Sequence, residues 1–354
     1  MGKVIHTALA SFGMSGLVFH GPLLKVNPNF RLCKILERTK KRSSKAYPEA
    51  TIVHSFREIL DDPRIDLVIV NTPDYLHYEM CKQALLAGKH VVVEKPFAQS
   101  VPEADELMGM AAAKGLILTV FQNRRWDADF LTVKKVIEEN MLGRLVELES
   151  RFDRYRNYIQ PGTWKEGGNE KVGVLYNLGS HMVDQALVLF GMPNSVTAQL
   201  DVLRDGGKVT DYYDIRLQYE RLSVILKSSY LVREPGTRYS LHGTLGSFHK
   251  WGIDPQEEDL KSGRLPDDMG WGSEPSSRWG QINTEINGLH LTGKVETIPG
   301  NYNAFYENLY DVLANGAELI VKPEESRDGL IVLEACMQSN REKRTVALNG
   351  QRFQ

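Results

Sequence analysis

The 354-residue chain has few cysteines, little excess charge and no long apolar run. Cys33, Cys81 and Cys336 lie far apart and form no CxxC or Cys/His cluster, which argues against a disulfide framework or a structural zinc site. The 43 basic and 45 acidic side chains give a formal net charge of -2, so no global field favours nucleic acid or a membrane surface. The N-terminal apolar run, residues 4–10, is too short and polar for a signal peptide or a membrane span. We therefore expect a cytoplasmic protein that binds no metal, no nucleic acid and no membrane.

What the chain does have is enough apolar residues, 42%, to build a core, and enough length for about two domains. Its first third alternates short runs of Val, Ile and Leu with helical patterns. One expected helix covers residues 76–87, and another begins at a capping box of Ser100 and Glu103 and stops at Gly115. This alternation predicts right-handed βαβ crossovers and a doubly wound parallel sheet. The expected strands are residues 4–10, 30–36, 67–71, 90–94 and 117–121.

After about Gln122 the pattern changes. Strands with alternating apolar and polar residues follow one another without intervening helices, which predicts antiparallel pairing. Residues 252–275 are rich in Gly, Pro, Asp and Glu, and we interpret them as a long surface excursion. We therefore divide the chain into an α/β domain over residues 1–122 and an α+β domain over residues 123–354. The expected strands of the second part are 145–152, 213–219, 223–230 and 239–242, and its expected helices are 130–140, 178–190, 302–314 and 325–339.

A dinucleotide-binding fingerprint follows the first expected strand. Ser11-Phe12-Gly13-Met14-Ser15-Gly16 matches G-x-G-x-x-G with serine at the first position. Gly13 would let the backbone approach a pyrophosphate, and Gly16 would let the following helix pack closely on the strand. A surface turn with chance glycines fits the bare pattern equally well.

The second expected strand bears on the choice of cofactor. Glu37 lies 21 residues after Gly16, about where an acid meets the adenosine ribose hydroxyls, and this favours NAD. Arg38 and the basic residues 40–42 follow at once, and a guanidinium there can accept the 2′-phosphate of NADP, although a solvated basic turn fits as well. The sequence leaves NADP or NAD open.

Polar residues also follow the later strands, where an open α/β sheet binds its ligand. Asn71-Thr72-Pro73 with His77 follows one strand, and Glu94-Lys95-Pro96 follows another. We predict that Lys95 is catalytic beside a nicotinamide; the alternative is a solvated strand-end charge. The predicted cofactor contacts are Ser11, Phe12, Gly13, Met14, Ser15, Gly16, Glu37, Arg38, Asn71, Thr72, Pro73, His77, Glu94, Lys95 and Gln122.

A second polar group lies in the expected helix near residue 180. Asn177, His181 and Asp184 are spaced i, i+4 and i+7, which places them on one helical face. An amide, an imidazole and a carboxylate so arranged can bind vicinal hydroxyls and move a proton at neutral pH. A histidine satisfied within the core is the alternative, and a metal site lacks further ligands at a recognisable spacing.

Aromatic and polar residues elsewhere suggest a sugar or polyol pocket. Aromatic faces and fork-shaped donors suit ring C–H groups and hydroxyls. A surface ion-pair cluster with aromatic packing is the alternative for the same segments, which include Arg124 and Arg125. Together with Asp184, the predicted substrate-binding residues are Asn123, Trp126, Arg154, Tyr155 and Trp164.

Taken together, these motifs resemble the glucose-fructose oxidoreductase/inositol dehydrogenase/MocA family over nearly the whole chain. Two further segments, residues 19–24 and 251–257, resemble the bacterial scyllo-inositol 2-dehydrogenase-like members of that family. The segments that carry the family resemblance are residues 11–16, 72–73, 87–96, 123–127 and 178–185.

The resemblance implies a Rossmann domain followed by a domain with a large open antiparallel sheet, which often packs against another subunit in a homodimer or homotetramer. It also implies that Lys95 and His181 act together. Many members have an aspartate at the position of Asn177 that completes a Lys, Asp, His triad, and this sequence departs there. An amide can orient a lysine or a hydroxyl but cannot hold charge.

The leading hypothesis is an NAD(P)-dependent oxidoreductase that transfers a hydride between nicotinamide and a secondary alcohol or ketone of a cyclic polyol or sugar. Asn177 motivates a second hypothesis, a non-catalytic NAD(P)-binding sensor on the same fold. A third is a reductase for another sugar-derived carbonyl.

Overall fold

The structure of the chain, a computed structural model, describes residues 3–39, 41–168 and 171–348, apart from the side chain of Trp164. Two compact units share the chain, and neither is continuous in sequence. The chain first leaves unit 1 after Asp127, and two later segments belong to unit 1 again. The domain boundary after residue 122 stays a prediction. Unit 1 consists of Met1–Asp127, Pro255–Gly272 and Gly300–Arg327, and unit 2 consists of Ala128–Asp254, Ser273–Pro299 and Asp328–Gln354.

A six-stranded parallel sheet forms the centre of unit 1, as the alternating pattern predicted. Its strand order, β3-β2-β1-β4-β5-β6, reverses direction between β1 and β4, and such a switch point opens a ligand crevice at the carboxyl ends of the strands. All five predicted strands are present. The sequence analysis missed β3, which has three residues and begins on an exposed one. The strands are β1 (Ile5–Leu9), β2 (Phe30–Leu36), β3 (Thr51–Val53), β4 (Leu67–Val70), β5 (His90–Val93) and β6 (Leu118–Val120).

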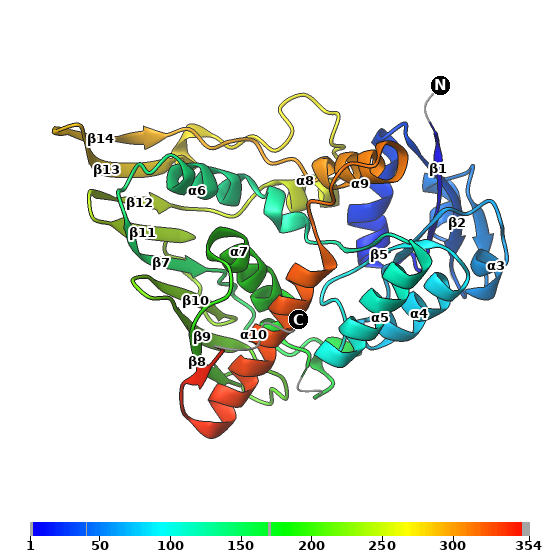
Figure 1. The fold of residues 1–354 in the computed structure, drawn as a ribbon, viewed down its shortest axis with the longest axis horizontal. Coiled ribbons are helices and arrows are strands. Elements are labelled where there is room, and N and C mark those ends of the chain that lie inside the picture. Colours follow the sequence, from blue (N-terminus) through cyan, green and yellow to red (C-terminus); the bar gives the residue numbers. More distant parts are fainter. Residues whose placement is uncertain (1–2, 40, 169–170, 349–354) are drawn as a thin grey trace. The chain divides into compact units, whose positions relative to one another are not determined.

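Helices flank this sheet (Figure 1). α4 and α5 pack together, with α4 against β4 and β5, whereas α1 packs on β2 and on α9. The predicted capping box is confirmed: Ser100 Oγ accepts from the N–H of Glu103, the Glu103 carboxylate accepts from the N–H of Gln99, and α5 ends at Gly115 in the left-handed region. The helices are η1 (Gly16–His20), α1 (Gly21–Val26), α2 (Ser43–Ala46), α3 (Arg57–Leu60), η2 (Asp74–Leu76), α4 (His77–Leu86), α5 (Val101–Lys114), η3 (Asn123–Trp126), α8 (Gln256–Ser262) and α9 (Asn303–Asn315).

A nine-stranded sheet forms the centre of unit 2, in the order β14-β13-β12-β11-β7-β10-β9-β8-β15. Its neighbours pair antiparallel, as predicted, except that β7 and β10 run parallel. The strands are β7 (Leu145–Arg151), β8 (Ser195–Asp201), β9 (Tyr212–Gln218), β10 (Ser223–Ser229), β11 (Tyr239–Gly243), β12 (Gly246–Lys250), β13 (Gly280–Ile286), β14 (Leu289–Val295) and β15 (Val346–Ala347).

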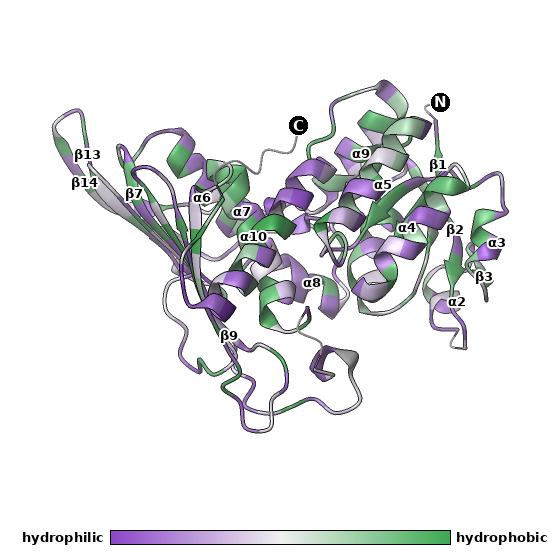
Figure 2. Cartoon of the chain, turned by 60° about the horizontal axis from the view of Figure 1, so that its bottom comes forward, coloured by the Kyte–Doolittle hydropathy of each residue, from purple (hydrophilic) through white to green (hydrophobic). Residues whose placement is uncertain are grey.

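The helices of unit 2 lie on one side of its sheet, which Figure 2 shows nearly edge-on with α6, α7 and α10 to one side. Alternate residues of β9 reflect this: Tyr213, Ile215 and Leu217 are buried, whereas Arg216 and Gln218 are exposed. Because successive side chains of a strand point to opposite faces, the sheet has one covered and one open face. The helical segments are α6 (Ala128–Glu138), η4 (Trp164–Glu166), η5 (Leu175–Gly179), α7 (Ser180–Phe190), η6 (Ser276–Arg278) and α10 (Pro323–Glu342), which begins in unit 1 and passes into unit 2 after Arg327.

The prediction of a long surface excursion over residues 252–275 is only partly right, because residues 261–263 and 267–270 are exposed but other parts of the stretch are buried. α8 lies within this stretch, and its Gln256 is fully buried in unit 1. The Gln256 amide donates to the carbonyl of Trp126 and accepts from Trp271 Nε1 and from the N–H of Tyr302, at 3.0, 3.0 and 2.7 Å. The polar composition of this segment favoured a position in solvent, but the Gln256 amide forms its hydrogen bonds inside the protein rather than with water.

The arginines that follow β6 do form ion pairs, but the arginine side chains themselves are buried rather than on the surface. Arg124, 5% exposed, donates to Asp127 at 3.1 Å and to Glu257 at 2.5 Å. Arg125 donates to Glu325 at 2.7 Å. Because Glu257 and Glu325 come from the returning segments of unit 1, these pairs join segments that are distant in sequence.

Replacing Arg124 by methionine is therefore expected to lower the free energy of unfolding by about 3–5 kcal/mol, because the carboxylate of Asp127 would stay buried without the positive charge of its arginine. Urea denaturation followed by circular dichroism measures the loss. The control is Arg57→Met, which breaks an exposed pair with Asp61 and should cost nothing measurable. Equal losses in both variants would show that burial of the Arg124 pair does not matter.

Among the described helices, none combines the length and the apolar character that a membrane span needs. The described residues also contain no group of three or more His, Cys, Asp or Glu side chains that could hold a metal ion.

Candidate active site

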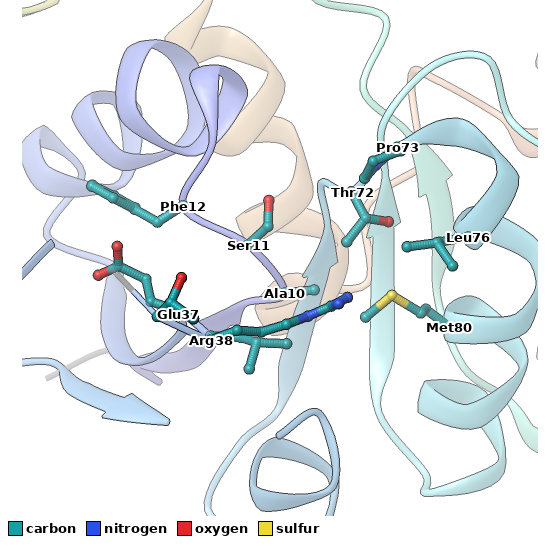
Figure 3. Close-up of a pocket in the computed structure, with 11 residues that line it drawn as sticks. Ala10, Ser11, Phe12, Glu37, Arg38, Thr72, Pro73, Leu76 and Met80 are labelled. Carbon is teal, nitrogen blue, oxygen red and sulfur yellow. The ribbon is translucent and has the colours of Figure 1, made fainter. Parts of the chain in front are cut away.

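A pocket opens in unit 1 at the carboxyl ends of β1, β2 and β4 (Figure 3). The volume of the pocket is about 660 Å³, part of which is open to solvent. The pocket lies at the switch point of the sheet. Leu76 and Met80 give it an apolar wall that the sequence analysis missed, because nothing distinguishes them there from core residues of a helix. The predicted cofactor residues that line it are Ser11, Phe12, Glu37, Arg38, Thr72 and Pro73.

The loop after β1 is fastened to the end of β4 by Asn71. The N–H of Ser11 donates to Asn71 Oδ1 at 2.9 Å, and Asn71 Nδ2 donates back to the Ser11 carbonyl at 2.9 Å. Ser11 Oγ donates to the Asn71 carbonyl at 2.7 Å, and Ser15 Oγ approaches the same oxygen at 3.4 Å. Ser11 stands at the first glycine position of the fingerprint, and its hydrogen bonds with Asn71 hold the turn in place. Met14 is 53% exposed beside it.

The two glycines of this loop have different surroundings. A Cβ on Gly16 would approach the Ser11 carbonyl oxygen to 2.8 Å and Asn71 Nδ2 to 2.9 Å, so the close approach of loop and helix requires glycine there. A Cβ on Gly13 would meet nothing nearer than Ser11 Oγ at 4.0 Å. The protein itself thus has room for a side chain at Gly13, which is the position where the fingerprint brings a pyrophosphate to the backbone.

Gly16→Ala is accordingly expected to lower the free energy of unfolding by about 1–3 kcal/mol through overpacking. Gly13→Ala should leave stability within about 0.5 kcal/mol of the wild type, as surface substitutions do. The added methyl of Gly13→Ala should instead weaken dinucleotide binding about tenfold or more, since it occupies the pyrophosphate position. Urea denaturation and cofactor titration of both variants separate the two effects; a Gly13→Ala protein that binds the cofactor normally would contradict this assignment.

The carboxylate of Glu37 is engaged by its own chain. Its Oε1 accepts from the N–H of Arg42 at 3.0 Å, and its Oε2 accepts from the N–H and the hydroxyl of Ser43 at 3.0 and 2.5 Å. Glu37 is 6% exposed. It therefore fixes the turn before α2, and these contacts leave little of its capacity for ribose hydroxyls.

Arg38 is exposed and lines the pocket. Figure 3 shows its side chain extending toward Met80, whereas the Glu37 carboxylate points to the side of Phe12. A guanidinium so placed can bind a phosphate with two parallel hydrogen bonds.

Two buried polar atoms near the strand ends have no hydrogen-bond partner within the described part of the chain. One is Thr72 Oγ1, on a residue that lines the pocket, and the other is Oε1 of Gln122, which follows β6. Buried polar atoms are normally paired, so a bound group that offers donors or acceptors would satisfy them. The pocket, the open position at Gly13 and the unpaired Thr72 Oγ1 fit a dinucleotide.

The strand-end residues Glu94 and Lys95 follow β5, and Lys95 is half-buried. A cis peptide bond joins Lys95 to Pro96. His77 does not line the pocket: its Nδ1 contacts the Pro96 carbonyl at 2.8 Å and its Nε2 the Thr72 carbonyl at 3.0 Å. Burial lowers the pKa of His77. We interpret His77 as a structural residue that links the segment after β4 to the segment after β5.

In unit 2, Asn177, His181 and Asp184 lie in one helical segment, as expected, although its first part is the π-helix η5. His181 is 6% exposed and Asp184 is 3% exposed, whereas Asn177 is half-buried. The segment therefore presents an imidazole, a carboxylate and an amide within three turns, a set suited to proton transfer and hydroxyl binding.

Contacts of Gln185 and Met182 anchor α7 on the sheet of unit 2. The hydroxyl of Tyr239 donates to Gln185 Oε1 at 2.7 Å, and the Tyr213 hydroxyl contacts Met182 Sδ at 2.8 Å. Val183 and Ala186 of the same helix are buried as well. The sheet thus sets the position of the helix that carries His181.

The predicted substrate residues occupy different surroundings. Asn123 is buried in unit 1, where Trp126 is half-buried with its ring 6.1 Å from that of Phe305. In unit 2, Arg154 lies 5.5 Å from the ring of Phe152, and Tyr155 is 41% exposed and accepts from Arg233. The side chain of Trp164 lies outside the described residues.

Two family models match the chain. A model described as an oxidoreductase family with a NAD-binding Rossmann fold matches residues 5–122, and the C-terminal alpha/beta domain of the same oxidoreductase family matches residues 134–348. The chain belongs to the Gfo/Idh/MocA oxidoreductase family. The predicted family, the fold class and the oxidoreductase class are thereby confirmed, as is an NAD(P) cofactor with the choice between NAD and NADP still open.

This Gfo/Idh/MocA protein is 40% identical to scyllo-inositol 2-dehydrogenase (NADP(+)) IolW of Bacillus subtilis, over 97% of this chain and 96% of the relative. It is 37% identical to the uncharacterized oxidoreductase YdgJ of Escherichia coli, over 98% of this chain and 100% of that protein. A solved oxidoreductase structure from Bacillus cereus has a TM-score of 0.91 at 34% identity, covering 99% of this chain and 100% of that chain.

Proposed function

We propose that the protein is an NADP-dependent oxidoreductase that transfers a hydride between the nicotinamide and a secondary alcohol or ketone of a cyclic polyol or sugar of the scyllo-inositol type. The observation that carries the cofactor choice is the engagement of Glu37 by Arg42 and Ser43, which leaves Arg38 as the charged group in the pocket. The relative from Bacillus subtilis, named for scyllo-inositol and NADP(+), supports both halves of the proposal.

The electrostatic argument favours a 2′-phosphate. A guanidinium pairs with phosphate through charge-assisted hydrogen bonds, whereas an unmodified ribose needs an acceptor for its hydroxyls. Glu37 already accepts three hydrogen bonds from its own turn. Glu37 therefore has little accepting capacity left for the ribose hydroxyls of NAD, whereas Arg38 can bind the 2′-phosphate of NADP.

In the proposed reaction, the cofactor supplies the hydride acceptor. Lys95 donates a hydrogen bond to the reacting oxygen and stabilises developing alkoxide, and the His181 imidazole takes the hydroxyl proton. Asn177 and Asp184 bind neighbouring hydroxyls. The alcohol carbon loses a hydride and its oxygen loses a proton, so a ketone results, and the steps run in reverse for reduction.

We also propose that Asn123, Trp126, Arg154, Tyr155 and Trp164 contribute to substrate binding, and that the sheet of unit 2 forms the interface of a homodimer or homotetramer. The open face of that sheet supports the second point. Light scattering on the purified protein measures the subunit number, and a monomer at micromolar concentration would contradict it.

The test of the proposed function is to mix purified protein with NADP or NAD and a panel of inositols, aldoses and their ketones, and to follow nicotinamide absorbance in both directions. We expect turnover of a cyclic polyol or sugar with NADP in preference to NAD. Cofactor binding without turnover of any panel member would favour a sensor, the function suggested by an amide at Asn177. Faster reduction of an unrelated carbonyl would point to a different substrate.

A further inference from the structure

Three polar side chains from distant parts of the sequence form a hydrogen-bonded series inside unit 1. His20 Nδ1 lies 2.7 Å from the hydroxyl oxygen of Tyr306, and His20 Nε2 lies 3.0 Å from Glu94 Oε1. His20 and Tyr306 are fully buried, and the side chain of Glu94 is 13% exposed. Glu94 immediately precedes Lys95, so the series ends at the proposed reaction centre.

The protonation states of the two ends give the series a direction. Burial, together with the charge of Glu94, raises the pKa of Tyr306 well above its usual value, so the phenol keeps its proton. Burial acts to raise the pKa of Glu94, but the contact with His20 and the charges of Lys95 and His77 outweigh it and lower that pKa. Tyr306 can therefore donate its hydroxyl hydrogen to Nδ1, and Nε2–H can donate to the Glu94 carboxylate.

Aromatic packing fixes the ring of His20 in this orientation. Its centroid lies 4.3 Å from that of Phe121, and the Tyr306 ring packs edge-on against Phe30 at 5.4 Å. The imidazole thus has little freedom to turn its Nε2 away from Glu94. A histidine held between a phenol and a carboxylate keeps one tautomer and fixes the carboxylate in turn.

We propose that His20, supported by Tyr306, is a positioning residue that fixes Glu94 as an ionised carboxylate at the carboxyl end of β5, where its charge favours oxidised over reduced nicotinamide. This inference rests on the proposed function. In a doubly wound sheet the adenosine half of the cofactor binds toward β2, so the nicotinamide half lies toward β4 and β5. The oxidised ring carries a positive charge that the reduced ring lacks, so a nearby carboxylate separates their affinities.

The experiment measures the dissociation constants of NADP+ and NADPH by calorimetry and by NADPH fluorescence, at pH 6 and pH 8. His20→Leu removes the donor to Glu94, so the Glu94 pKa should rise and its charge should fade at the lower pH. We expect the ratio of the NADP+ to the NADPH dissociation constant to increase roughly three- to thirtyfold at pH 6, and less at pH 8. His20→Gln keeps an N–H near the Nε2 position and should restore the wild-type ratio to within about twofold.

Two tyrosine variants on α9 provide a matched comparison. Tyr306→Phe removes the hydroxyl behind His20 and should raise the ratio in the same direction as His20→Leu, by a smaller factor. Tyr310 lies on the same helix and its ring packs on Phe30. Tyr310→Phe removes its hydroxyl and should leave the ratio of the two dissociation constants unchanged. Equal weakening of both nucleotides in folded His20→Leu, or failure of His20→Gln to restore the ratio, would overturn the inference.

Nitrogen NMR of the ligand-free protein separates this inference from the proposed function. We expect His20 to carry a proton on Nε2, the nitrogen that faces Glu94, and a proton on Nδ1 instead would overturn the proposed contact with Glu94. If wild-type protein bound neither nucleotide, the proposed function and the charge effect would both fail, whereas the NMR result would still decide whether His20 holds Glu94.

Discussion

Replacing Lys95 by alanine is expected to lower kcat/KM for polyol oxidation by about 10²–10⁴-fold, the usual contribution of a group that assists proton movement and charge development. The loss should fall on kcat, because in the proposed reaction the ammonium stabilises the developing alkoxide more than the bound substrate. Steady-state kinetics with saturating NADP measure it. His181→Ala should show a loss of similar size.

Lys82→Ala is the matched control, since Lys82 lies in unit 1 and forms a partly exposed ion pair with Glu106 away from the strand ends. Its turnover should equal that of the wild type. Unchanged turnover in Lys95→Ala would remove Lys95 from the reaction. Circular dichroism establishes that both variants are folded.

Arg38→Ala is expected to lower kcat/KM for NADP roughly 10- to 100-fold, because a charge-assisted hydrogen bond contributes about 1.5–3 kcal/mol. The value for NAD should change little, because NAD has no 2′-phosphate for the guanidinium to bind. The ratio of the two specificity constants is the decisive measurement. Arg57→Ala, which removes an exposed arginine on α3, serves as the control.

A parallel loss with NADP and NAD in Arg38→Ala would mean that the arginine supports the pocket rather than the phosphate. Glu37→Ala should not raise kcat/KM for NAD, because Glu37 holds the turn before α2 and its removal should disorder that turn. An increase in kcat/KM for NAD would contradict this interpretation. The two variants thus test the cofactor choice from opposite sides.

Much of the fold follows from local rules. The buried parallel strands of unit 1 appear as runs of Val, Ile and Leu because both of their faces are covered. The end of α5 at Gly115 follows from the left-handed conformation that glycine adopts most easily. These features depend on residues close in sequence, so their signals are visible there. The short β3 carries too few residues to give such a signal.

The cofactor site shows where local reasoning ends. The spacing of Glu37 from Gly16 is a sequence feature, and by itself it favours NAD. The hydrogen bonds from Arg42 and Ser43 to its carboxylate depend on the path of the turn between them. Only the folded turn therefore shows that the Glu37 carboxylate is engaged by its own chain, the observation on which the proposed preference for NADP rests.

The sequence by itself determined the doubly wound sheet, the mostly antiparallel sheet after it, the fingerprint at Gly13 and Gly16, and the family to which these motifs belong. The tertiary structure alone decided that the segments carrying Gln256 and Tyr306 return to unit 1. It also decided that the Tyr306 hydroxyl contacts His20, a residue 286 positions away in the sequence. Periodicity and turn chemistry are local, so they can be predicted from neighbouring residues. Burial of Gln256, Arg124 and His20 depends on partners that chain folding alone brings within hydrogen-bond distance.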